Sequence, residues 1–487
     1  MISIKKIDDD TFTLKSNTIA DKSFNADKNN SIPSDEEIQF NIRSLFSNSL
    51  ESQLSSIKFF EYNLREFDII LPPRYIEITM NILHSHAQDQ EIVNMILKLY
   101  RHCTSFQSEM QAILSEKNVI DLITPFFPSQ DVLVIYGNLS IPSRSIRDRL
   151  LSMGILNQII SLLFINNGEP PLQINTDIFE YAVNLLNCLI CKLDGFDYSK
   201  YFSEFIRIFE ILHSLYANAT VEQALIIIRA FSDYVDADVA FISDFQSKCQ
   251  LRIFLEKDFD DDKISRWILD IIISITFTFG TEGAEFLSKI QIIDWISKRI
   301  LSKSPKVVER CFFVLTQIIQ LITSPHFFTN ECINLNFLVI AIDKFNSNIK
   351  YRLKITLYRF ICSVFAKATT SMIPLMINDK ALELIAYNYD IISDNYEFDE
   401  IDDREHDWLL IFYAFQRIIP FYSHEYTDQN EIASAIRDSI SQIKRNDEFI
   451  DWLFKLRELE NLEDMEYDEY EDFNIEDLEY IIEILLK

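Results

Sequence analysis

The sequence predicts an all-α protein in which helices stack side by side into a helical solenoid. Three observations predict it. Glycine and proline are scarce, with 6 and 12 in 487 residues, whereas tight β-turns and phosphate-cradling loops rely on glycine. Apolar residues recur at helical spacing from Glu37 to about residue 457. One apolar pattern also returns at a nearly constant interval, which is typical of repeat proteins.

The first 36 residues differ from the rest of the chain. Residues 1–36 are polar, rich in Asn, Ser, Asp and Lys, and show no sustained periodicity. Such a segment cannot bury enough apolar area to offset the entropy lost on ordering. We therefore expect residues 1–36 to form a flexible arm and residues 37–457 to form the solenoid.

The repeat is visible at points where one helix gives way to the next. The stretch "LSEKNVIDLI" at Leu114 has counterparts of varying strength that begin at Leu151, Asp197, Ile242, Leu287, Cys332 and Met376. The successive intervals are 37, 46, 45, 45, 45 and 44 residues. Chance matches in a chain rich in Ile and Leu are the alternative, but five consecutive intervals agree within two residues. A period near 44 indicates a helical solenoid.

A second, strongly apolar helix precedes most of these points. The segments are "VNLLNCLICKL", "ALIIIRAFSDYV", "WILDIIISITFTF", "CFFVLTQIIQLI", "LYRFICSVFAKA" and "WLLIFYAFQRIIPFY". Helices that are apolar nearly all round are expected to lie between two neighbours. We therefore predict that these helices form the interior of the stack.

One repeat carries a family resemblance. The stretch "IYGNLSIPSRSIRDRLLSMGILNQIISLL", residues 135–163, resembles an armadillo repeat of the kind found in importin-α and β-catenin. The resemblance implies a right-handed α-α superhelix, an armadillo-type solenoid, of about eight units. It also assigns Gly154 to the sharp bend between a short helix and the next, where a left-handed conformation favours glycine. For Gly137 we expect close helix packing.

The motif is weaker in the other repeats. The residues near the glycine place are Asn118, Ile290, Asn334 and either Asn378 or Asp379. Each unit can therefore be a three-helix armadillo repeat or a two-helix HEAT-like repeat, and both give a solenoid.

The resemblance also implies a binding surface. In the family, the last helix of each repeat lines a concave groove, where an Asn pairs with the ligand backbone and a Trp four residues earlier forms a slot for basic side chains. The matching candidates in this chain are Asn138, Asn187, Ser232, Ser274, Thr316 and Ser363. Val134 and Val183 stand at the tryptophan place, so binding of nuclear localisation signals in the importin manner is not expected.

The net charge and the cysteine content indicate which classes of partner and which cell compartment to expect. The net charge of −30 disfavours nucleic acid or an anionic membrane as partner and favours basic protein segments. Seven cysteines, mostly within apolar helical runs, are typical of a reduced intracellular protein. The N-terminus lacks a long apolar segment, and no stretch reaches the length of unbroken apolar residues that a membrane span needs. We expect a cytoplasmic protein and leave the nucleus open.

Motifs for catalysis, metals and cofactors are weak. Cys188 and Cys191 in "CLIC" lie within a helical run, and His84 and His86 would point apart on a helix. The run "DFDDDK" has Lys263 where a calcium loop requires glycine. "GTEG" lacks the lysine of a phosphate loop. We predict no enzyme, no cofactor and no metal site.

The chain ends in an acidic tail, residues 458–487. Between Glu458 and Glu483 there are 13 acidic and no basic residues, and "NIEDLEYIIEILLK" can form a short amphipathic helix. The tail can cap the last repeat, compete for the groove, or dock another protein.

The predicted function is that of a non-catalytic scaffold for protein–protein interaction. The concave groove of the solenoid would hold an extended, basic partner segment through hydrogen bonds and complementary charge. The alternative is a nuclear transport adaptor similar to importin-α.

Overall fold

The computed structural model of the chain divides into two compact units, Met1–Gln250 and Leu251–Lys487, which are described separately. We call them unit 1 and unit 2. The structure describes residues 33–64, 71–106, 108–165, 173–193, 195–248, 251–257, 259–290, 292–369, 371–376, 384–385, 388, 407–418 and 451. The acidic tail and nearly all of the predicted N-terminal arm lie outside these residues.

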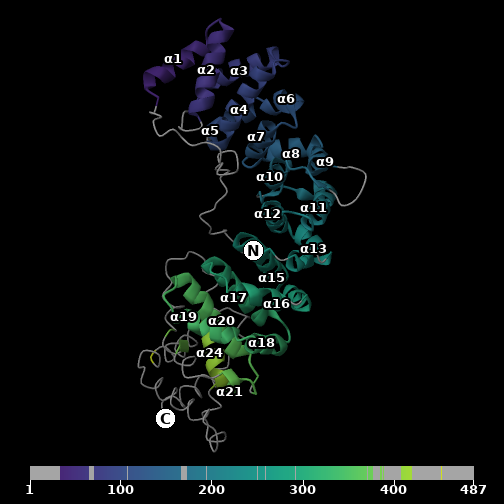
Figure 1. The fold of residues 1–487 in the computed structure, drawn as a ribbon, viewed down its shortest axis with the longest axis vertical. Helices are drawn as coiled ribbons and strands as arrows, with labels where there is room; N and C mark the ends of the chain where they lie inside the picture. The colour runs from purple at the N-terminus through teal and green to yellow at the C-terminus, as the bar shows by residue number, and fades with distance from the viewer. Residues whose placement is uncertain are drawn as a thin grey trace, which may run out of the picture. The chain divides into compact units, whose positions relative to one another are not determined.

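Unit 1 is built from helices that follow one another closely (Figure 1). Their bounds are α1 Asp35–Leu45, α2 Leu50–Asn63, α3 Pro73–Ser85, α4 Gln90–Phe106, α5 Ser108–Glu116, α6 Val119–Ile123, α7 Gln130–Ser140, α8 Arg144–Ser152, α9 Ile155–Leu163, α10 Phe179–Ile190, α11 Phe202–Tyr216, α12 Val221–Ala237 and α13 Val239–Ser247, with short 3-10 helices η1 Thr124–Phe126 and η2 Tyr198–Tyr201. The strands β1 Phe164–Ile165 and β2 Gln173–Ile174 pair antiparallel between α9 and α10. They are a local hairpin and leave the all-α class unchanged.

Local sequence explains where these helices begin. Ser34 starts α1 with a capping box, in which its hydroxyl accepts from the N–H of Glu37 and the Glu37 carboxylate accepts from the N–H of Ser34. Thr220 and Gln223 form the same arrangement at the start of α12. Each box satisfies backbone N–H groups that the first helical turn leaves without an intrahelical partner.

The helices of unit 1 form two rows. α2, α4, α7, α10 and α12 each pack against the next, and we call them, with their counterparts in unit 2, the ladder helices. The second row includes the consecutive neighbours α9, α11 and α13. Figure 1 shows α7, α10 and α12 along one side of this unit and α8, α9, α11 and α13 along the other. The apolar core lies between the rows, with Leu139, Leu186 and Phe231 fully or almost fully buried.

Unit 2 repeats this plan. Its described helices are α14 Leu251–Glu256, α15 Asp262–Lys289, α16 Ile292–Arg299, α17 Pro305–Leu321, α18 Pro325–Asn334, α19 Phe337–Phe345, α20 Tyr351–Lys367, α21 Ile373–Met376 and α24 Asp407–Ile418. The ladder helices of this unit are α15, α17, α20 and α24, each packed against the next. α16, α18 and α19 pack beside them.

Helix α15 is the longest described helix and is bent. Within its 28 residues, Gly280 has φ 50° and ψ −122°, so the helix is two segments joined at a kink. Among the described residues, only α15 is long and apolar enough to cross a membrane, and 44% of its most apolar window is buried inside the protein. The core helix of a soluble protein meets the same criterion, and Ile268, Leu269 and Ile272 of α15 are buried.

The order of helices identifies three-helix repeats in both units, whereas α10 is followed by the 3-10 helix η2 and then by α11. α7, α8 and α9 form one unit of ladder helix, short helix and second helix, as in a three-helix armadillo repeat. α4, α5 and α6 follow the same order, as do α17, α18 and α19. In α15 the segment after Gly280 takes the place of the short helix. The helices predicted in front of the repeat points are present as α10, α12, α15, α17, α20 and α24.

The bend before the second helix is confirmed and placed more accurately. Gly154 is left-handed, with φ 77°, and Asn118 and Asn336 take the same place in two other repeats with φ 55° and 57°. The residue in α18's repeat is therefore Asn336, two positions beyond the predicted Asn334. Ile290 has φ −87° and is not left-handed. Asn378 and Asp379 lie outside the described residues.

Two other glycines mark close packing. A Cβ on Gly137 would lie 3.1 Å from the Cys188 Sγ of α10, which confirms the expected close approach of α7 and α10. A Cβ on Gly283 would lie 2.7 Å from the carbonyl oxygen of Ile275, just across the kink of α15. Gly283 therefore requires a residue without a side chain, whereas a side chain at Gly137 would require Cys188 to shift by a few tenths of an ångström.

Candidate functional site

The six residues predicted to line a groove all lie on ladder helices. In unit 1, Asn138 is on α7, Asn187 on α10 and Ser232 on α12, one residue on each successive helix. In unit 2 the successive ladder helices α15, α17 and α20 carry the other three, Ser274, Thr316 and Ser363. The structure thus gathers the candidates into two rows of three, one in each unit.

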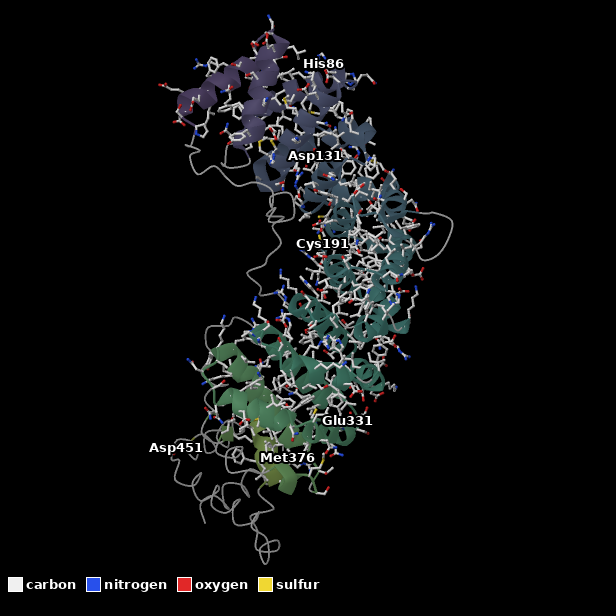
Figure 2. The ribbon with its side chains drawn as sticks, viewed as in Figure 1. His86, Asp131, Cys191, Glu331, Met376 and Asp451 are labelled. Atoms are coloured by element: carbon white, nitrogen blue, oxygen red, sulfur yellow. The ribbon has the colours of Figure 1, made fainter. Side chains whose placement is uncertain are left out.

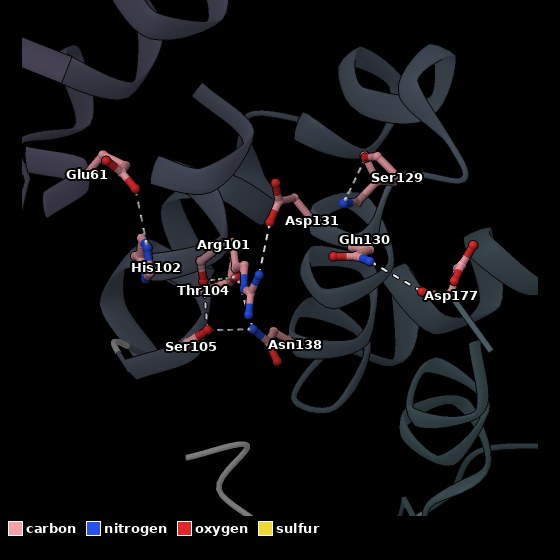
Figure 3. A network of polar contacts seen from close by, with 11 residues as sticks. Glu61, Arg101, His102, Thr104, Ser105, Ser129, Gln130, Asp131, Asn138 and Asp177 are labelled. Carbon is pink, nitrogen blue, oxygen red and sulfur yellow. Dashed lines mark hydrogen bonds and ion pairs between the residues drawn. The ribbon is translucent and has the colours of Figure 1, made fainter. Parts of the chain in front are cut away.

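Asn138 belongs to a polar network inside unit 1 (Figure 3). Its Nδ2 donates to Thr104 Oγ1 and to Ser105 Oγ, both at 3.1 Å. These two hydroxyls in turn donate to the carbonyl of Arg101. The amide of Asn138 therefore joins α7 to α4.

Charged side chains extend this network along the ladder. Arg101 Nη1 donates to Asp131 Oδ1 at 3.2 Å, which joins α4 to α7. His102 Nε2 lies 4.0 Å from Glu61 Oε1 of α2 (Figure 3). Both partners of the Arg101–Asp131 pair are largely buried, so the pair is screened less by salt than a surface pair.

Asn187 differs from Asn138 because its amide has no partner. Asn187 is 5% exposed, and neither its Nδ2 nor its Oδ1 makes a hydrogen bond within the described part of the chain. The Oγ of Ser232, on the neighbouring ladder helix, is also buried and without a partner there. Burial of an amide without hydrogen bonds costs about 1–3 kcal/mol. Buried groups in this state are unusual and require an explanation.

Glu180 shares the face of α10 that carries Asn187. Glu180, Asn184 and Asn187 follow a spacing of four and then three residues, so they lie along one side of the helix. Glu180 is partly buried and forms no ion pair with a described residue. Burial raises the pKa of its carboxyl above the ordinary value. Glu180, Asn184 and Asn187 on α10, with Ser232 on α12, are called the ladder site below.

The candidates of unit 2 are bonded within their own helices. Ser274 Oγ donates to the carbonyl of Asp270, Thr316 Oγ1 to that of Phe312 and Ser363 Oγ to that of Arg359, each four residues back. Ser363 Oγ also accepts from Gln320 Nε2 at 3.1 Å. A hydroxyl in a helix commonly satisfies itself in this way.

The two positions that correspond to the tryptophan of the family motif hold small aliphatic side chains, as the sequence shows. Val183 of α10 is fully buried, and Val134 of α7 is partly buried. Neither position offers an aromatic slot for a basic side chain.

The polar cluster around Arg147 of α8 was not predicted from the sequence. Arg147 is fully buried, and its Nη1 donates to the Cys191 carbonyl at 2.7 Å and to Tyr198 Oη at 2.9 Å. Its Nε donates to the Ser140 carbonyl at 3.3 Å. Cys191 lies just after the end of α10 (Figure 2). The available signal was that Arg147 shares the apolar face of Leu150 and Leu151.

The cysteines of "CLIC" lie in this core. Cys188 is buried and Cys191 partly buried. Burial raises the pKa of both thiols, and the neighbouring Arg147 opposes that rise. A thiol with a raised pKa is a poor nucleophile near neutral pH. Over the described residues, no group of three His, Cys, Asp or Glu side chains is arranged to hold a metal ion.

Comparison with known proteins agrees with this architecture. No family model matches the chain, and no curated protein matches it. The crystal structure of an engineered protein from the Northeast Structural Genomics Consortium aligns with a TM-score of 0.60 and 11% identity, over 92% of this chain and 98% of that one. A structure reported with a phosphorylation switch that controls the interaction between cadherin and β-catenin aligns with a TM-score of 0.54 and 10% identity, over 92% and 90%.

A third solved structure matches about half of the chain. It is a designed armadillo repeat protein in complex with the peptide (KR)4, with a TM-score of 0.39 and 12% identity, over 53% of this chain and 98% of that one. The first two alignments, at 10% and 11% identity, concern the fold alone. The chain has the fold of an armadillo-type helical solenoid.

Proposed function

We propose that the ladder site of unit 1 binds an extended polypeptide segment with basic side chains, and that the protein acts by binding alone. The observation that carries this proposal is the Asn187 amide, which is buried and has no partner in the described structure. An extended backbone offers one N–H and one C=O per residue, and a primary amide can pair with both. Because both amide atoms are buried, the Asn187 side chain would have to turn outward to meet such a ligand, which would then offset its desolvation.

The charge preference comes from Glu180. Its carboxylate is partly buried, has no described counter-ion and lies on the same side of α10 as Asn187. A lysine or arginine side chain of the ligand would stabilise the ionised form. The net charge of −30 adds a long-range attraction for basic segments.

A binding measurement tests the proposal. The probe is a fluorescein-labelled octapeptide of alternating lysine and arginine, titrated with the full chain while its anisotropy is followed. We expect Asn187→Ala to weaken binding about tenfold, which corresponds to about 1.4 kcal/mol. The matched control is Asn157→Ala, which removes an exposed asparagine of α9 outside the ladder site.

A stability measurement distinguishes a ligand-binding role of Asn187 from a structural one. Because Asn187 has no described partner, Asn187→Ala should leave the melting temperature unchanged or raise it. A large drop in melting temperature, or unchanged binding in both Asn187→Ala and Glu180→Gln, would contradict the proposal. Binding should also weaken as salt rises from 50 to 300 mM, since the contact with Glu180 is ionic.

The transport-adaptor alternative has no specific observation in its favour, since valines stand at positions 134 and 183. For the compartment we propose the cytoplasm, because the described cysteines are all free and mainly buried, as in a reducing environment. Microscopy of the full chain with a fluorescent tag tests that location.

A further inference from the structure

Two aromatic rings lie next to each other on successive ladder helices of unit 2. Phe277 of α15 and Phe313 of α17 have ring centroids 6.0 Å apart and ring planes 31° from parallel. Phe277 is 42% exposed, and Phe313 is partly exposed. Single exposed apolar residues are common on protein surfaces, but these two form one apolar surface across two helices. Ile273, one turn before Phe277, is also partly exposed and extends this surface.

An ion pair fixes the same two helices against each other on this face. Arg310 Nε of α17 donates to Asp270 Oδ1 of α15 at 2.5 Å. Arg310 is three residues before Phe313, and Asp270 is seven residues before Phe277. Residues at these spacings share one side of a helix, so the ion pair and the rings lie on one face of the two packed helices.

The helical turns that carry the two rings are uncharged. The stretches 271–281 and 311–322 contain no Asp, Glu, Lys or Arg, although 25% of the chain is charged. The charged residues directly before these stretches, Asp270 and Arg310, are paired with each other. Glu309 of α17 accepts from an arginine of α20. A charged side chain of a ligand would find no opposite charge on either stretch, so the surface is complementary to an uncharged, apolar side chain.

An amide group lies beside the rings. Gln317 is one turn beyond Phe313 on α17 and is partly exposed, and it forms no hydrogen bond with a described residue. A primary amide can donate to a main-chain carbonyl and accept from a main-chain N–H. A ligand helix pairs these groups within itself, whereas an extended segment offers them to a neighbour. The Gln317 amide therefore suits an extended segment better than a helical one.

We propose that Phe277, Phe313 and Gln317 form a docking surface for an extended polypeptide segment of another protein that carries an apolar side chain. That side chain, a leucine, methionine or phenylalanine, covers the two rings, and the Gln317 amide bonds the main chain beside it. Removal of the rings from water supplies the favourable free energy. The surface differs from the ladder site in the class of side chain that it binds, and it includes no residue of unit 1.

Selection from a random peptide library tests the proposal. Phage that display random decapeptides are selected on the full chain, and the selected peptides are then titrated against the parent and the double variant Phe277→Ser, Phe313→Ser. We expect a group of peptides with Leu, Met or Phe to bind the double variant about tenfold more weakly than the parent. The matched control is Phe40→Ser, which removes a phenylalanine of α1 that is 68% exposed and should leave the binding of this group unchanged.

Three outcomes would overturn the proposal. The first is that every selected peptide binds the parent and the double variant equally. The second is that the peptides that depend on the two rings are rich in Lys or Arg and lack apolar side chains, which would make the surface a second site for basic segments. The third is that the parent sediments as a dimer and the double variant as a monomer, which would assign the surface to a second copy of the chain.

Milder variants keep the test valid if the double variant does not fold. Phe277→Ser alone removes the more exposed ring, and Gln317→Ala removes only the amide, so both should keep the melting temperature of the parent and still weaken the binding of the apolar peptides. Unchanged binding in both would refute the proposal. Asn187→Ala, in unit 1, should leave the binding of these peptides unchanged. Failure of this docking surface is thereby distinguished from failure of the ladder site.

Discussion

Arg147 Nη1 donates to the carbonyl oxygen of Cys191 at 2.7 Å, and this contact joins α8 to the end of the next ladder helix, α10. The same guanidinium donates from Nε to the carbonyl of Ser140, the last residue of α7. Carbonyls at the C-terminal end of a helix lack intrahelical partners and favour a nearby cation. One buried side chain therefore satisfies the ends of two adjacent ladder helices.

Replacing this side chain should destabilise unit 1 strongly. Arg147→Met keeps most of the volume but leaves the Ser140 carbonyl without its donor, and it removes one donor each from the Tyr198 hydroxyl and from the Cys191 carbonyl, which still accepts from Tyr198 Oη. We expect a loss of about 3 kcal/mol in the free energy of unfolding. Urea denaturation of Arg147→Met and of the control Arg144→Met, which changes an exposed arginine of the same helix, checks it. Equal urea midpoints for the two variants would contradict this role.

The bend at Gly154 predicts a graded response to substitution. Gly154 has φ 77°, and a Cβ there would meet nothing within 4 Å, so only backbone strain opposes a side chain. Gly154→Ala should cost about 1–2 kcal/mol. Gly154→Asn should cost less, because Asn118 and Asn336 adopt the same conformation in other repeats. Thermal denaturation of both variants tests this order, and an alanine variant as stable as the asparagine variant would refute it.

At Gly283 a side chain is opposed by a steric clash rather than by backbone strain. A Cβ at this position would lie 2.7 Å from the main-chain oxygen of Ile275, and a main-chain atom cannot move aside as a flexible side chain can. Gly283→Ala should therefore lower the free energy of unfolding by about 2 kcal/mol. The exposed neighbour Thr281→Ala serves as control. Chemical denaturation that shows the same loss for both would mean that the kink of α15 relaxes freely.

Glu180 predicts a dependence of stability on pH. Burial raises the pKa of this carboxyl in the folded state above its value of 4.5, so the folded protein binds the proton more tightly than the unfolded one. The contribution of Glu180 to stability is therefore present at low pH and is lost as pH rises through the raised pKa.

The variant Glu180→Gln isolates this contribution. It should be more stable than the parent at pH 7 and bind the basic octapeptide less tightly, while the stability difference should shrink as pH falls toward 4. Melting temperatures of both chains measured across this pH range test it. A stability difference that grows as pH falls would have the wrong sign for a carboxyl with a raised pKa.

The fold could be predicted from the sequence because the spacing of apolar residues shows both the helices and the interval at which they repeat. Leu114, Leu151, Leu287 and Cys332 each lie at or near the end of a helix that hands over to the next. The resemblance of residues 135–163 to one armadillo repeat was enough to place Gly154 in a left-handed bend. The main-chain conformation at such a bend depends on one residue, so the identity of that residue is enough to predict it.

The candidate site was harder to predict, because hydrogen bonding depends on neighbours from other repeats. Asn138 and Asn187 match the same family position, yet only Asn138 meets the hydroxyls of Thr104 and Ser105. The hydroxyls of Thr316 and Ser363 donate to carbonyls of their own helices. The spacing of residues in the sequence does not indicate such bonds. Arg147 was missed because an arginine on an apolar face is usually exposed, and its acceptors are carbonyls that carry no sequence signal.

The contacts between α7 and α10 determine how unit 1 can flex. A solenoid bends by small rotations at the junctions between its repeats. At this junction a rotation would stretch the bonds from Arg147 to Ser140 and Cys191 together, and it would press Gly137 against Cys188. This junction therefore resists rotation of α7 against α10. A polypeptide bound along the ladder helices of unit 1 would therefore meet α7 and α10 at a nearly constant separation.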